Sequence, residues 1–171
     1  MRPLKMAFLS LIGLGLIVPT LGAQQNQTIE IAEWDVPWER SGPRDPYVAP
    51  DGKVWFVGQR SHYVAWLDRE TGEFGQFPLE DGTGPHNLVV AEDGTVFYAG
   101  NRMTHIGSVN PESGEIERFM MPDEAARDPH TLVFGHEGEI WFTVQQGNFV
   151  GRFLPETGDV TLLQTPTVTF R

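Results

Sequence analysis

The sequence predicts an all-β protein, a partial β-propeller of four-stranded antiparallel blades. One observation is a repeat of 42 and 44 residues between three turn glycines: Gly52, Gly94 and Gly138. A second series has the same spacing: Gly72, Gly114 and Gly158. Each repeat carries four short apolar runs, and no segment has a sustained helical period. This period is typical of propeller blades, whereas a repetitive β-sandwich would explain the strands but not the spacing.

The first 23 residues are predicted to be a secretory signal peptide, outside the fold. Arg2 and Lys5 give a positive start, residues 6–18 are apolar but short for a spanning helix, and small residues precede Gln24. We therefore expect cleavage near Gln24 and a periplasmic or secreted mature protein. An uncleaved N-terminal anchor is the alternative.

The mature domain, residues 24–171, begins with a predicted strand that has no neighbours. Residues 29–37 alternate apolar and polar side chains over much of their length, as a half-buried strand does. The run ends in Val36-Pro37, like the ends of the later repeats. We interpret it as the orphan outer strand of a blade whose other strands are missing from its N-terminal side.

Three complete blades follow, over about residues 43–78, 85–122 and 129–166. We name their predicted strands a to d in chain order. Strands a are expected at 46–49, 87–91 and 131–135; strands b at 53–58, 95–100 and 139–144; strands c at 63–67, 105–109 and 149–153; and strands d at 73–78, 115–121 and 159–164. Most are rich in β-branched and aromatic residues, and Asp51-Gly52 and Asp93-Gly94 are hairpin signals.

Strand a of the first blade allows two alignments. Arg44-Asp45-Pro46-Tyr47 matches Arg127-Asp128-Pro129-His130 in local sequence, whereas counting back from Gly52 sets Pro43-Arg44 opposite Pro129-His130. A tight turn fixes the register of a hairpin, so we adopt the count from the glycine.

Composition limits the classes of partner. The chain has no cysteine, which excludes disulfides, thiolate metal sites and a cysteine nucleophile. Without residues 1–23, ten basic and twenty-three acidic residues remain, a formal charge of −13. Such a surface repels nucleic acid and anionic lipid. We expect no nucleic-acid partner, and no membrane association after signal cleavage.

The functional site is predicted at the end of the blades where the d→a and b→c connections meet. Loops on a rigid scaffold commonly carry function, and strand a lies nearest the central channel of a propeller. A small molecule is the ligand that this end favours. The candidate ligand-binding residues at the channel mouth are Arg44, Gln59, His86, Asn101, His130 and Gln145.

His86 and His130 occupy equivalent positions in successive repeats. Two imidazoles at one channel are typical of a metal site or of acid–base chemistry. The alternative is that each Pro-His pair is a structural turn whose imidazole bonds to a neighbouring backbone. His62, His105 and His136 are interpreted as ordinary surface histidines. The residues themselves assign no catalytic group and no metal ligand.

Aromatic side chains recur near the start of strand b, at Trp55, Phe97 and Trp141. Their repetition predicts packing between blades and not ligand stacking.

Pro-His-x-Leu-Val occurs in two repeats, and the third repeat also carries Ile-Trp-Phe, Val-Gly-Arg and Pro-Glu-Thr-Gly, which have variants in the earlier repeats. They resemble the blades of the virginiamycin B lyase family over residues 29–166. The resemblance implies a seven-bladed propeller. Its lyase members are magnesium-dependent and open streptogramin B antibiotics by elimination across the ester bond, an antibiotic-resistance activity that uses a histidine base and a metal site of Glu and His.

The sequence departs from that family at strand b. Where family repeats often end Trp-Phe-Thr-Glu, this chain has Gly58, Gly100 and Val144. The family's catalytic residues also lie in later blades. The resemblance therefore carries over only to His86 and His130, as channel-facing residues, and we expect a fragment that lacks the catalytic blades.

Three functions stay open: a streptogramin-lyase-like enzyme with magnesium, a non-enzymatic propeller that binds a ligand or partner, and a gluconolactonase-like metal-dependent lactonase. The lactonase would use Asp45, Asn87 and Asn101 around a divalent ion. Open blade edges favour self-association, because the outward face of the last blade, with Phe142, Val150 or their neighbours depending on the register, would stay unburied.

Overall fold

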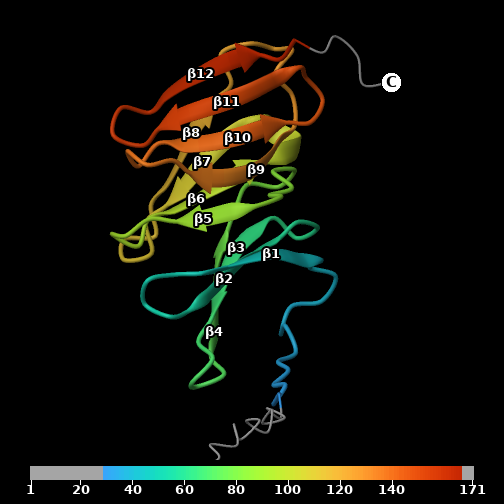
Figure 1. The fold of residues 1–171 in the computed structure, drawn as a ribbon. Helices are drawn as coiled ribbons and strands as arrows, with labels where there is room; N and C mark the ends of the chain where they lie inside the picture. Colours follow the sequence, from blue (N-terminus) through green and yellow to red (C-terminus); the bar gives the residue numbers. More distant parts are fainter. Residues whose placement is uncertain (1–28, 167–171) are drawn as a thin grey trace, which may run out of the picture. The chain divides into compact units, whose positions relative to one another are not determined.

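The computed structural model describes residues 29–166, and its strands all lie in the unit that begins at Trp34 (Figure 1). Residues 29–33 belong to a separate unit and form no strand. The predicted signal peptide lies outside the described residues. None of the described helices has the length and apolar character needed to cross a membrane.

Within residues 29–166, twelve strands form three four-stranded antiparallel sheets, each a meander in chain order. The first sheet has β1 (Pro43–Val48), β2 (Val54–Gly58), β3 (Tyr63–Leu67) and β4 (Phe74–Pro78). The second has β5 (Leu88–Val90), β6 (Val96–Gly100), β7 (His105–Val109) and β8 (Ile116–Met120), with the 3-10 turn η1 (Asn101–Met103) after β6. The third has β9 (Pro129–Phe134), β10 (Ile140–Val144), β11 (Phe149–Leu154) and β12 (Asp159–Gln164). The predicted partial propeller is confirmed.

The strand expected over residues 29–37 is not formed. A strand needs a partner for its backbone, and no described strand pairs with this segment. The end of this segment and the residue after it instead pack on the first blade: Val36 and Trp38 lie against a cluster that includes Phe56 and Tyr63. The rings of Trp38 and Tyr63 have centroids 5.0 Å apart.

The register of strand a follows the turn glycines, as predicted. Pro43 pairs with Gly58, and Pro129 pairs with Val144 at the equivalent place in the third blade.

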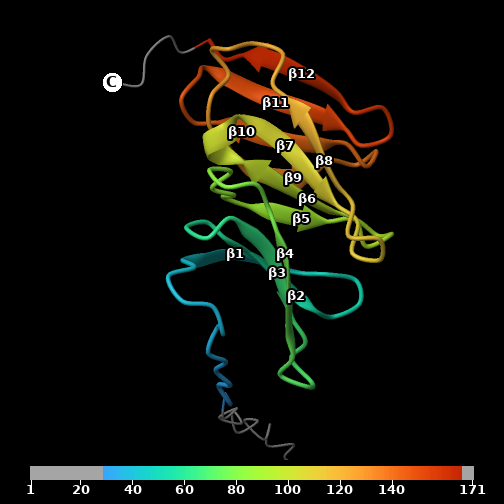
Figure 2. The ribbon, with the colours of Figure 1, turned by 180° about the vertical axis from the view of Figure 1, so that it is seen from behind.

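The blades pack face to face in chain order (Figures 1 and 2). In strand b, alternate residues point to the preceding and to the following blade. Trp55 thus joins Tyr98 in the core between the first and second blades, and Phe97 joins Phe142 in the core between the second and third. The predicted packing role of the recurring aromatic residues is confirmed for Trp55 and Phe97.

The same alternation identifies the open face of the third blade. Trp141, equivalent to Trp55 and Phe97, is only half-buried, as is Val150. On the outer strands of this blade Val133 is 54% exposed and Leu163 49% exposed. The register, which the sequence left open, places Trp141 and Val150 on this face, whereas Phe142 is 2% exposed because its position points back toward the second blade.

Candidate functional site

A β-bulge begins the first strand of each blade at the predicted loop end. In β1, Arg44 pairs with Val57 but the next pair is Tyr47 with Trp55, so one extra residue is accommodated. In β9 the same irregularity falls between Pro129 and Leu132.

The second blade repeats the bulge through hydrogen bonds to one residue of β6. The His86 N–H donates to the carbonyl of Ala99 over 3.0 Å, and the Ala99 N–H donates to the carbonyl of Asn87 over 2.9 Å. Bulges redirect side chains and are frequent beside functional sites.

The bulges bring His86 and His130 together. Their ring centroids lie 3.3 Å apart, with the planes inclined by 38°. His86 is buried at 7% exposure, whereas His130 is half-buried and its Nδ1 lies 3.1 Å from the hydroxyl of Thr131. The predicted equivalence of the two histidines therefore becomes direct contact between neighbouring blades.

Asp45 of the first blade extends this cluster. Its Oδ2 lies 3.4 Å from Nδ1 of His86, within ion-pair distance but without the geometry of a hydrogen bond, so Nδ1 is buried with no hydrogen-bond partner. The same oxygen accepts a hydrogen bond from Nε of Arg44 over 3.0 Å. Nη1 of Arg44 donates to Oε1 of Gln59 over 3.0 Å. The site thus spans the inner strands of all three blades.

The pKa of His86 is lowered from 6.5 to about 4, first by burial and then by electrostatic interaction with His130 and Arg44, while Asp45 opposes the shift. His86 is therefore uncharged at neutral pH. An uncharged imidazole can donate or accept a hydrogen bond, but with this pKa it is a weak base.

The remaining predicted residues act mainly as links between blades. The side-chain amide of Asn101 donates to the carboxylate of Asp128 and, over 3.2 Å, to the carbonyl of Pro129. Oδ1 of Asn87 accepts from the N–H of Leu132 over 2.7 Å. These hydrogen bonds hold both amides against the third blade.

Gln145 lies exposed on the b→c loop of the third blade. Its backbone N–H donates to the carbonyl of Asp128 over 2.9 Å. The structure brings Arg44, Gln59 and His86 together with His130, and leaves Gln145 at the rim.

Two residues important to this end escaped the sequence reasoning. Asp128 binds Asn101 and Gln146, and Asp45, considered only as a lactonase ligand, faces His86. Both precede proline and have positive φ angles of 67° and 49°, which Asp tolerates better than most residues. The recurring Arg-Asp-Pro sequence was the available signal.

The prediction of three surface histidines is wrong for His105, which is fully buried in β7. Its ring lies over Gly100 of β6, where a Cβ would collide with it. His62 accepts a hydrogen bond at Nδ1 from the N–H of Gly84 over 3.0 Å, so it connects the first blade to the loop before His86.

A hollow of about 420 Å³ runs along the inner strands of the three blades. Asp45 and Asn87 line it from the loop end, and Val89 and Phe134 line it further along. This is the volume of a small ligand site. Neither His86 nor His130 lines this hollow; Asp45 and Asn87 are the lining residues that adjoin them. Hollows of about 580 and 810 Å³ lie toward the a→b turns.

The described residues do not fit a magnesium centre. Within residues 29–166, no group of three or more His, Asp or Glu side chains is placed to hold a metal ion. Mg²⁺ prefers oxygen ligands in octahedral geometry. Asp45 is the carboxylate beside the two histidines, and Arg44 already binds it. No chemical step is therefore assigned to a metal here.

Comparison with known proteins agrees with this architecture. The model of the virginiamycin B lyase family matches residues 21–169. The virginiamycin B lyase of Staphylococcus aureus is 26% identical, with a TM-score of 0.73 over 80% of this chain and 45% of that one. A catalytically inactive variant of the S. aureus lyase with quinupristin is 25% identical, with a TM-score of 0.73 over 80% and 46% of the two chains.

A more distant match shares the fold alone. Hydrazine synthase of Kuenenia stuttgartiensis is 15% identical, with a TM-score of 0.66 over 80% of this chain and 40% of that one. No protein with a curated description matches the sequence significantly.

The chain spans less than half the length of the solved lyases that it matches. The family match itself covers nearly the whole sequence. The chain belongs to the virginiamycin B lyase family.

Proposed function

We propose that the protein binds a cyclic ester of the streptogramin B type at the loop end, as part of a lyase-like propeller. The observation that carries this proposal is the contact between His86 and His130, next to Asp45, which lines the inner hollow. The quinupristin complex of the S. aureus lyase supports this choice of ligand.

The two histidines have different parts in the proposal. His86 is buried and uncharged, so it orients the ligand by hydrogen bonding. His130 is more exposed and is the candidate proton acceptor. In the elimination, a base removes a proton from carbon, the adjacent C–O bond of the ester breaks, and a C=C bond and a carboxylate form.

Three further elements are part of the same proposal. Further blades complete the ring, whether from more polypeptide or from a second copy, and supply the magnesium ligands that residues 29–166 lack. Residues 1–23 direct export of the protein and are removed in the process. Opening of the antibiotic then confers resistance outside the cytoplasm.

One assay separates this function from the alternatives. The full chain is incubated with quinupristin in magnesium or in EDTA, and products are separated by chromatography and weighed by mass spectrometry. A magnesium-dependent ring-opened product of unchanged mass is expected where a second copy completes the ring. A product heavier by one water would indicate the lactonase. Binding without a product would indicate a non-enzymatic propeller or a ring that needs further polypeptide.

Export has an independent test. The intact mass of protein from the soluble periplasmic fraction should correspond to a chain that begins near Gln24. A mass that retains residues 1–23 would contradict the signal-peptide assignment.

A further inference from the structure

Two exposed arginines occupy the same position in successive blades at the loop end. Arg60 follows β2 and Gln59, and Arg102 follows β6 and Asn101. The backbone N–H of Arg60 donates to the carbonyl of Ser41 over 3.0 Å, and that of Arg102 to the carbonyl of Thr83 over 3.1 Å. Each arginine is therefore anchored against the loop that enters its own blade.

Glycines in those loops position the side chains. Gly42 and Gly84 have φ angles of +59° and +51°. A Cβ on Gly42 would lie 3.1 Å from Cγ of Arg60, and one on Gly84 would lie 2.5 Å from Cδ of Arg102. Because glycine has no Cβ, each arginine stem can lie across its loop. The guanidinium groups are thereby held beside the loop ends that lead to Arg44 and His86.

The third blade carries different residues at both positions. Asp128, with φ of 67°, replaces the glycine, and Gln146 replaces the arginine. Nε2 of Gln146 donates to Oδ2 of Asp128 over 3.2 Å, and Asn101 of the preceding blade binds the other carboxylate oxygen. In the third blade, therefore, the carboxylate of Asp128 is bound by the side-chain amides of Gln146 and Asn101.

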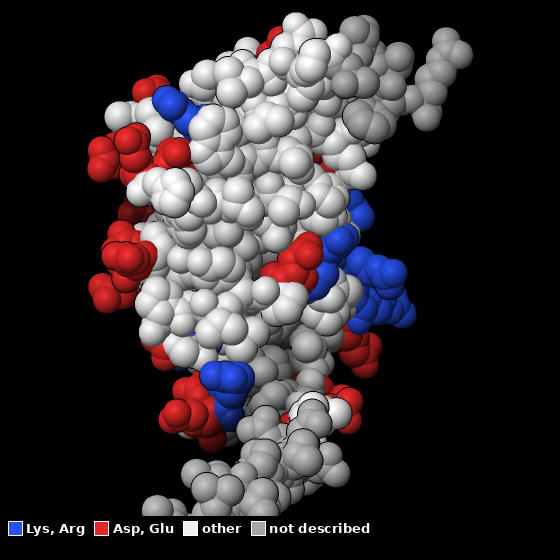
Figure 3. Space-filling model, viewed as in Figure 1, with Lys and Arg blue, Asp and Glu red and all other residues white. Residues whose placement is uncertain are grey.

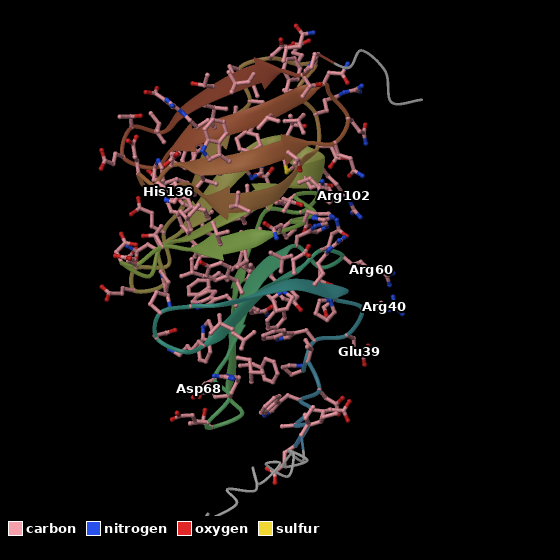
Figure 4. The ribbon with its side chains drawn as sticks, viewed as in Figure 1. Glu39, Arg40, Arg60, Asp68, Arg102 and His136 are labelled. Carbon is pink, nitrogen blue, oxygen red and sulfur yellow. The ribbon has the colours of Figure 1, made fainter. Side chains whose placement is uncertain are left out.

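No such carboxylate accompanies the arginines of the first two blades. Over residues 29–166, neither Arg60 nor Arg102 forms an ion pair; the pairs present involve Arg44, Lys53, His86 and Arg118. Figure 4 places Arg102, Arg60 and Arg40 along one edge, where Figure 3 shows the basic side chains gathered. Much of the acidic surface in this view lies along the opposite edge, where Asp68 is labelled.

We propose that Arg60 and Arg102 bind an oxyanion of the ligand, a carboxylate, sulfate or phosphate group. The planar guanidinium binds such groups through two parallel hydrogen bonds, and this protein binds a carboxylate of its own at the equivalent place in the third blade. This inference rests on the proposed function in one respect: the proposed function places the ligand at the loop end of the blades. In the proposed elimination, the carboxylate released from the ester is one such group.

Arginine Nε–H signals in ¹H–¹⁵N spectra test the proposal directly. The ¹⁵N-labelled full chain is titrated separately with sodium sulfate, phosphate and acetate, each against sodium chloride of equal ionic strength. The signals of Arg60 and Arg102 should shift saturably with at least one oxyanion. Arg69 lies in the exposed turn between β3 and β4 and is the internal control.

Two variants reproduce the arrangement of the third blade. Arg102→Gln introduces the residue found at Gln146 and should weaken oxyanion binding at this position at least about tenfold. Gly84→Asp introduces the equivalent of Asp128 and should abolish the response of Arg102 while Arg60 keeps its own. Arg69→Gln should change neither, and circular dichroism confirms that each variant folds. If Gly84→Asp does not fold, the comparison of Arg102→Gln with the unmodified chain is sufficient to test the proposal.

The outcomes separate this inference from the proposed function. Equal responses to sulfate and chloride, or equal shifts of Arg69, would reduce the effect to charge screening and overturn the inference. Saturable oxyanion binding that is insensitive to Arg102→Gln would also overturn it. Saturable binding without conversion of quinupristin would leave the inference standing and count against the lyase proposal.

Discussion

The imidazoles of His86 and His130 lie in contact, with ring centroids 3.3 Å apart, although 44 residues separate them in the sequence. The contact forms because both residues occupy the bulge that begins the first strand of a blade. Asp45, at the bulge of the preceding blade, adds a carboxylate to the pair. One repeated backbone feature thus assembles a polar cluster from three blades.

We expect His86→Ala and His130→Ala each to lower the free energy of unfolding by less than about 2 kcal/mol and to weaken ligand binding. The effect on stability should be larger for His86, which is buried, than for the half-buried His130. Urea denaturation and a quinupristin titration measure the two quantities, with His136→Ala as the control. A loss above about 2 kcal/mol for either variant would favour a structural turn.

Stability should fall between pH 7.5 and pH 5 because the pKa of His86 is about 4 in the folded protein and 6.5 as its ordinary value. In this window the unfolded chain binds a proton that the folded protein excludes, so stability is highest above pH 6.5 and decreases with pH down to about 4. His86 alone should account for about 2 kcal/mol between these two conditions.

Urea unfolding at both pH values, with His86→Gln as the comparison, isolates this contribution. The buried His105, whose pKa is also lowered by burial, should keep part of the pH dependence in the variant. An identical pH dependence with and without His86 would contradict its lowered pKa.

Gly151→Ala should destabilise the third blade by about 1–3 kcal/mol, because a Cβ there would collide with the buried ring of Phe142. Thermal unfolding measures the effect. Combining it with Phe142→Leu should cost less than the sum of the two single changes, since the smaller side chain leaves room for the methyl group. If the losses of the two single variants simply add, the effect of Gly151→Ala does not come from a collision with Phe142.

The strands were largely predictable from the sequence because the repeat is regular. The third strands of the first two blades, β3 and β7, agree with the predicted residues, since aromatic and β-branched side chains fill them between clear turn signals. The prediction of a strand at residues 29–37 was wrong, because an alternating sequence pattern does not show whether a partner strand is present.

The site was less predictable than the fold. The sequence identified His86 and His130 as equivalent, but their contact depends on bulges that no local pattern specifies. The burial of His105 was missed because it depends on the small Gly100 across the sheet. Whether Phe142 or its neighbours lie on the open face was left undecided, because the sequence alone does not fix which face of the blade each residue of strand b occupies.

The open face of the third blade should cause self-association of the purified chain. Val133 and Leu163 are about half exposed there, beside Trp141. Light scattering is expected to give a mass above that of the monomer. The double change Val133→Glu and Leu163→Glu should reduce it, whereas Met120→Glu, at a residue 62% exposed on β8, should not. A cooperative, soluble monomer of the unmodified chain would contradict this expectation.

The central claim, that the ligand meets the histidine pair at the loop end, is tested most directly by imidazole NMR signals during a quinupristin titration of the full chain. We predict saturable shifts of the ring signals of His86 and His130. Figure 4 places His136 at the opposite edge, so its signal should stay unchanged. Shifts confined to His136, or no histidine shifts while binding is observed by calorimetry, would contradict the account.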